Sequence, residues 1–138
     1  MQQLTQEILR LCREYGECRV EVERMEEARR VKNALESVCA MARQRLDISD
    51  PALLLALLDA CEVTRDEGML QEVLDVVGRN LDRLAVSAES VKLLACCYYY
   101  VEEEECVERA GRMLEELRKM GRGEEELADV ETILEKLT

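Results

Sequence analysis

One stretch, from Pro51 to Val63, is apolar almost all round if it forms a helix. Pro51 fits the first position of a helix, and Ser49 and Asp50 offer side-chain oxygens that cap the free backbone N–H groups. The apolar residues that follow are Leu53, Leu54, Leu55, Leu57, Leu58, Ala60 and Cys61. A helix that is apolar on every side has to be buried on several sides. We therefore expect this helix at the centre of the fold, with neighbours from both earlier and later parts of the chain.

A similar pattern recurs further along the chain. The residues from Arg45 to Val63 read RLDISDPALLLALLDACEV, and a shift of 38 residues gives RLAVSAESVKLLACCYYYV from Arg83 to Val101. Both stretches open with Arg and Leu, carry Ser at the fifth position and close with Val. A spacing in the thirties, with one pair of helices in each unit, is typical of helical repeat proteins.

Apolar residues at helical spacing predict about seven helices. The expected ranges are about 3–15, 19–46, 51–63, 67–84, 88–101, 105–120 and 124–137. Gly16 and Gly121 are expected to end helices, and Asp66 and Ser87 are expected to begin them. The first half of the second helix is expected either to project beyond the body or to break near Val22.

Short connections make neighbouring helices antiparallel. The sequence therefore predicts one all-α domain, residues 1–138, built as an array of helical hairpins that resembles an α-solenoid. The last helix, 124–137, would cover the open end of the array. A closed helical bundle is the alternative, because the apolar stripes fit both arrangements.

Composition and charge narrow the function. A chain of 138 residues fits a single domain, and a hydrophobic content of 48% excludes disorder as its main state. The formal net charge is −12, which disfavours binding to the phosphates of nucleic acids or to an anionic membrane surface. A basic protein or peptide remains allowed as a partner. The alternative is that the acidic residues only keep the surface soluble.

The chain has an odd number of cysteines, so they cannot all pair in disulfides within it, and most lie within helical patterns. The seven are Cys12, Cys18, Cys39, Cys61, Cys96, Cys97 and Cys106. This pattern favours reduced thiols that serve as small core residues. Charged residues interrupt the N-terminal stretch, so no signal peptide is predicted, and no apolar run is long enough to span a membrane. We therefore expect an intracellular, cytoplasmic protein.

Chemistry that needs histidine is excluded, because the chain has no His, and it also lacks Phe and Trp. Without a base beside a thiol, nucleophilic catalysis is not expected, and no cofactor is predicted. No pair of cysteines has the C-x-x-C spacing of structural zinc sites, so no metal ligands are predicted. A small metal or redox protein that uses its cysteines stays as one alternative. The missing residue types keep a second alternative open, a designed or generated helical protein without a natural function.

The predicted partner-binding residues lie at the end of the helix at 88–101. Three successive tyrosines turn through about 200° of a helix, so they cannot all face one core, and at least one should reach the surface. Exposed tyrosine is favoured at protein interfaces, and an acidic run follows directly. The predicted set is Tyr98, Tyr99, Tyr100, Glu102, Glu103 and Glu104. The alternative is that Tyr98 packs inside while Tyr99 or Tyr100 lies half-buried against arginine side chains, and that the glutamates form a solvated turn.

The two helices at 88–101 and 105–120 resemble a tetratricopeptide repeat unit. Leu94, Ala95 and Tyr98 are similar to the small and aromatic residues of the first helix of that repeat, and Val107 or Ala110 would be the small residue of the second. The usual aromatic and glycine of the first helix and the closing proline are missing. The preceding pair resembles a pentatricopeptide or HEAT-like unit equally well. The resemblance implies an α-solenoid that binds proteins in a groove.

Overall fold

The fold is all-helical in the part of the chain that the computed structural model describes, residues 2–121, 128, 129, 131, 132, 135 and 136. No β-strand occurs among these residues, which confirms the predicted all-α class. In chain order the elements are α1 (Gln2–Cys18), η1 (Val22–Arg24), α2 (Met25–Arg43), α3 (Pro51–Thr64), α4 (Glu67–Arg79), η2 (Leu81–Arg83), α5 (Ala88–Val101) and α6 (Glu104–Lys119).

Helix α3 lies at the centre, as its apolar surface predicts. Pro51 is its first residue, and the Asp50 carboxylate accepts a hydrogen bond from the Leu53 backbone N–H at 3.2 Å. Seven of its side chains are buried: Leu53, Leu54, Ala56, Leu57, Leu58, Ala60 and Cys61. The helix packs against α1, α2, α4 and α5, so it is in contact with elements that precede and follow it in the chain.

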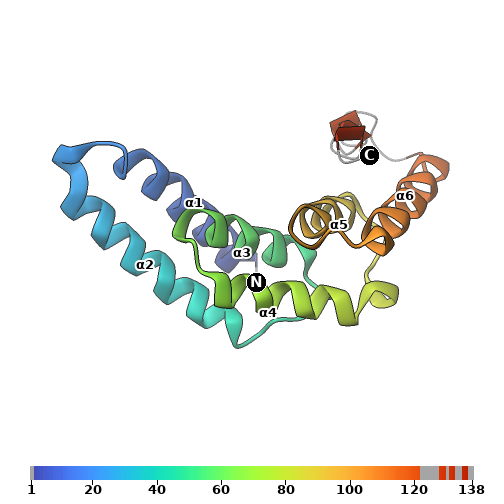
Figure 1. The fold of residues 1–138 in the computed structure, drawn as a ribbon, viewed down its shortest axis with the longest axis horizontal. Helices are drawn as coiled ribbons and strands as arrows, with labels where there is room; N and C mark the ends of the chain where they lie inside the picture. The colour runs from blue at the N-terminus through green and yellow to red at the C-terminus, as the bar shows by residue number, and fades with distance from the viewer. Residues whose placement is uncertain (1, 122–127, 130, 133–134, 137–138) are drawn as a thin grey trace.

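The helices pack in pairs that follow one another along the molecule. Helix α1 lies against α2, α3 against α4, and α5 against α6. The first helices of the pairs also pack on each other, α1 on α3 and α3 on α5. Figure 1 shows α2 and α6 at opposite ends of the molecule, with α3 and α4 between them.

The last two pairs share a spacing of 37 residues. Helix α3 spans residues 51–64 and α5 spans residues 88–101, so both ends differ by 37. Helices α4 and α6 begin at residues 67 and 104, which also differ by 37. The predicted shift of 38 is therefore wrong by one residue. The reason lies in the caps: Asp50 caps α3, whereas Ser87 itself caps α5, so Ser49 and Ser87 are not equivalent.

Several predicted boundaries move. Helix α1 continues through Gly16 to Cys18, and Gly16 does not take the left-handed backbone of a C-terminal cap. The predicted second helix is broken at η1, which confirms the expected break near Val22. Helix α4 ends at Arg79 rather than at 84, and the Asn80 side chain donates a hydrogen bond to the Val76 carbonyl at 2.7 Å.

The remaining caps agree with the sequence prediction. The Asp66 carboxylate accepts from the Met69 N–H at 3.0 Å, and the Ser87 hydroxyl accepts from the Ser90 N–H at 3.1 Å. Gly121 follows α6 with a φ of 68°, as expected of a C-terminal cap. Most of the predicted helix at 124–137 lies outside the described residues.

Candidate functional site

The three tyrosines of α5 point in different directions, as three successive helical residues must. Tyr98 and Tyr100 are half-buried and pack against the core, whereas Tyr99 is 68% exposed. The rings of Tyr99 and Tyr100 meet edge to face, with centroids 5.2 Å apart and an interplanar angle of 85°. This confirms that at least one tyrosine reaches the surface, and it identifies Tyr99 as that residue.

Tyr100 joins the end of α5 to α3. Its hydroxyl donates a hydrogen bond to the Glu62 carboxylate at 2.8 Å. Burial, together with this bond to an anion, raises the pKa of Tyr100 above its ordinary value. Tyr100 is therefore held in place beside Tyr99, whose ring contacts Tyr100 and otherwise stays largely exposed.

The acidic run forms the turn between α5 and α6. Glu102 ends α5 in the left-handed conformation, with a φ of 52°, and its N–H donates to the Tyr98 carbonyl at 2.8 Å. Glu103 precedes α6 without a side-chain capping bond, and Glu104 lies in the first turn, where the helix dipole favours a negative charge. All three side chains are exposed. The turn therefore presents a concentrated negative charge to solvent.

A hollow of about 280 Å³ lies between α4 and this turn. Glu103 lines it from the turn, Val101 lines it from the end of α5, and Asp75 and Arg79 line it from α4. One predicted residue, Glu103, therefore lines the same hollow as Asp75, a carboxylate of another helix. The other five predicted residues are not among those that line the hollow.

The polar residues of α4 in this hollow were not predicted as site residues. Gln71 and Asp75 share one face of α4, and the Gln71 amide donates to the Asp75 carboxylate at 2.9 Å. In the sequence they look like ordinary exposed positions of an amphipathic helix. Their place in the same hollow as Glu103 depends on how α4 packs beside α5, and no local sequence pattern encodes that packing.

The thiols are placed as core residues. Six of the seven cysteines are buried and Cys96 is half-buried. Burial raises the pKa of Cys12 to about 11 and the pKa values of Cys39, Cys61 and Cys97 to about 12. These thiols therefore stay protonated at neutral pH. Within the described part of the chain, no three His, Cys, Asp or Glu side chains gather where they could hold a metal ion.

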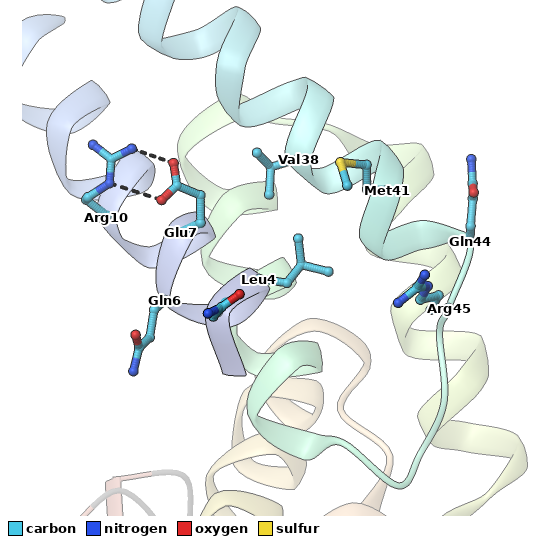
Figure 2. A pocket seen from close by; sticks show the side chains of 9 residues that line it. Leu4, Gln6, Glu7, Arg10, Val38, Met41, Gln44 and Arg45 are labelled. Carbon is cyan, nitrogen blue, oxygen red and sulfur yellow. Dashed lines mark hydrogen bonds and ion pairs between the residues drawn. The ribbon is translucent and has the colours of Figure 1, made fainter. Parts of the chain in front are cut away.

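A larger hollow, of about 800 Å³, lies between the start of α1 and the end of α2 (Figure 2). Its apolar lining comes from Leu4, Val38 and Met41, and its polar lining comes from Gln3, Gln6, Glu7, Arg10, Gln44 and Arg45. None of the predicted site residues lies here. The sequence signal was weak, because Leu4 and Val38 belong to helical stripes that are typical of core positions.

Comparison of the chain with protein-family models, with curated proteins and with solved structures found no match. None of the helices in the described ranges has both the length and the apolar character needed to cross a membrane.

Proposed function

We propose that this chain is an interaction module, a short array of helical hairpins that binds a basic segment of a protein partner at the α5–α6 turn. The observation that carries the proposal is the exposed ring of Tyr99 beside the acidic turn of Glu102, Glu103 and Glu104. A cationic side chain can lie over an exposed tyrosine ring while carboxylates neutralise its charge. Aromatic anchors within a charged rim are common at protein interfaces.

The arrangement of the helices supports an array rather than a closed bundle. The first helices of the pairs pack in succession, and α2 and α6 lie at opposite ends (Figure 1). The 37-residue spacing of the last two pairs is the regularity expected of repeated units. Such arrays offer long surfaces to partners, which is the use that the tetratricopeptide-like features of α5 and α6 suggest.

The hollow beside the turn suggests how one basic side chain would be held. Glu103 and Asp75 line it from two elements, with Val101 as an apolar wall, and the two carboxylates outnumber the one cation of the lining, Arg79. A lysine or arginine could place its aliphatic stem against Val101 and its charge between the carboxylates. Catalysis is not part of the proposal, since the chain has no histidine and its buried thiols are protonated at neutral pH.

The test is the binding of a fluorescein-labelled peptide rich in Lys and Arg, measured by anisotropy at about 0.01 M and about 0.15 M salt. We expect binding that weakens as salt rises. Tyr99→Ala should reduce the affinity about tenfold or more, and Glu103→Gln combined with Glu104→Gln should flatten the salt dependence.

Matched controls come from the same chain. Tyr15→Ala removes a tyrosine from α1, and Glu115→Gln with Glu116→Gln removes two exposed carboxylates from the C-terminal half of α6. Both controls should bind the basic peptide as the unmodified protein does. Equal losses in the controls, or binding that ignores salt, would count against the proposed site.

A further inference from the structure

The groove between α1 and α2 has the form of a helix-binding site. Figure 2 shows Leu4 reaching from α1 and Val38 and Met41 reaching from α2 into the space between the two helices. The Met41 side chain is 62% exposed, although it lies beside two half-buried apolar residues. Two adjacent helices with an apolar floor between them can receive a third helix along the groove. The volume of about 800 Å³ is much larger than one side chain needs.

The charge of this groove differs from the charge of the whole chain. The net charge is −12, yet Glu7 is the sole carboxylate among the nine lining residues. Arg10 donates to Glu7 at 3.2 Å and to Glu14 at 2.7 Å, and the bond to Arg10 lowers the pKa of Glu7 below its ordinary value. The one carboxylate of the groove is therefore already paired.

Arg45 gives the groove a positive charge that no ion pair neutralises within the described part of the chain. It is exposed at one end of the groove, next to Gln44, while Arg10 and Glu7 lie towards the other end (Figure 2). Within the described part of the chain, no acidic side chain lies at ion-pair distance from Arg45. The amides of Gln3, Gln6 and Gln44 add hydrogen-bond donors without negative charge.

We infer that the α1–α2 groove binds an acidic amphipathic helix of a protein partner. The apolar stripe of that helix packs on Leu4, Val38 and Met41, and a carboxylate near one of its ends pairs with Arg45. Charge complementarity selects this occupant, because a basic helix would bring its cations against Arg45 and would find no unpaired carboxylate among the lining residues. The site is separate from the α5–α6 turn and prefers the opposite charge, so either site can fail without the other.

The test uses two labelled helical peptides of about four turns. Both carry leucines at helical spacing, and the remaining positions are glutamates in one peptide and lysines in the other. We expect the glutamate peptide to bind at least about tenfold more tightly to a protein that carries Tyr99→Ala, Glu103→Gln and Glu104→Gln, which removes the proposed basic-peptide site. Equal binding of the two peptides would overturn the inference.

Two substitutions locate the binding, and each has a matched control. Met41→Gln removes the exposed apolar contact, with Met120→Gln as its control, since Met120 is 55% exposed near the end of α6. Arg45→Glu reverses the charge, with Arg30→Glu on the exposed face of α2 as its control. We expect about a tenfold loss for Met41→Gln and a reversed peptide preference for Arg45→Glu, with both controls unchanged. Circular dichroism of each variant checks that the helices remain.

Two further outcomes would also overturn the inference. The first is binding of the glutamate peptide that neither Met41→Gln nor Arg45→Glu alters. The second is self-association of the protein in sedimentation that Met41→Gln abolishes, because the groove would then be filled by a second copy of the chain.

Discussion

Single side chains satisfy the backbone N–H groups at the starts of α3, α4 and α5. Asp50, Asp66 and Ser87 each accept a hydrogen bond from the residue three positions later. These caps could be predicted from the sequence, since the bond spans only one turn of chain. The sequence left Ser49 and Asp50 both open as caps of α3, and the structure assigns the role to Asp50.

This assignment gives a matched pair of substitutions. Asp50→Ala should lower the free energy of unfolding by about 1 kcal/mol, because the Leu53 N–H loses its acceptor. Ser49→Ala should change it by less than about 0.5 kcal/mol, because the exposed Ser49 side chain makes no capping bond. Urea unfolding of the two variants checks the difference, and equal losses would contradict the assignment.

The buried thiols should make the protein less stable at alkaline pH. An unfolded cysteine ionises near its ordinary pKa of 9.0, whereas burial raises the pKa of folded Cys97 to about 12. Between these pH values the folded state holds more protons than the unfolded state, so the free energy of unfolding falls as pH rises.

Urea unfolding at about pH 7 and about pH 10, with reductant present, measures this loss. Cys97→Ala should show a smaller loss between the two pH values than the unmodified protein, since it has one fewer thiol to ionise on unfolding. A loss of the same size in Cys97→Ala would show that other groups cause the alkaline effect.

At the candidate sites, the sequence predicted the exposure of single residues but not which residues of different helices come together. The rotation of a helix by about 100° per residue was enough to predict that one of Tyr98, Tyr99 and Tyr100 is exposed. It could not predict that Asp75 and Glu103 line one hollow, or that Leu4 and Met41 line another, because each hollow depends on how separate elements pack together. Contacts between helices depend on how the side chains of two helix surfaces fit together. The hydrophobic periodicity of the sequence shows which face of a helix is buried, but not which helix covers it.

At the scale of elements, the turns after α3 and α5 have the same geometry. Arg65 and Glu102 have φ values of 57° and 52°, and their N–H groups donate to the carbonyls four residues earlier, at 2.7 and 2.8 Å. A left-handed backbone is unfavourable for residues with a Cβ atom, and glycine is the usual choice at this position. The predicted ends of α3 and α5 agree with the structure to within one residue. The left-handed backbone of Arg65 and Glu102 was not predicted, because neither arginine nor glutamate is typical of that conformation.

Arg65→Gly should therefore raise the free energy of unfolding by about 0.5–1 kcal/mol. Glycine removes the strain of the left-handed backbone in the folded state, and this gain in free energy is larger than the loss from the higher conformational entropy of glycine in the unfolded chain. Gln71→Gly, in the middle of α4, should instead lower it by about 1 kcal/mol. Thermal and urea unfolding check both. A destabilised Arg65→Gly variant would mean that the arginine side chain contributes more than its backbone costs.

The whole molecule depends on α3, which contacts the pair that precedes it and the pair that follows it. The sequence predicted both the all-α class and this central position, because only burial on several sides explains its apolar surface. The order of packing, with α1, α3 and α5 in succession, could not be predicted, since the apolar stripes fit a closed bundle equally well.

The central position of α3 predicts which helices are destabilised by a substitution in its core. Leu57→Ala should cost about 2–5 kcal/mol, because Leu57 is fully buried, and it should increase amide hydrogen exchange in both α1–α2 and α5–α6. Met113→Ala, also at a fully buried position but in α6, should increase exchange mainly in α5 and α6. Exchange measured by mass spectrometry distinguishes the two patterns, and identical patterns would contradict the central role of α3.

The equal spacing of α3–α4 and α5–α6 bears on how a chain of this kind can grow. A tandem duplication of the 37 residues from Asp66 to Glu102 would join Glu102 to a second Asp66, and so would place a left-handed residue directly before a cap, as Arg65 already stands before Asp66. The lengthened protein would gain one helix pair while every existing helix kept its own ends. Evolution or an engineer could in this way extend the molecule by whole modules.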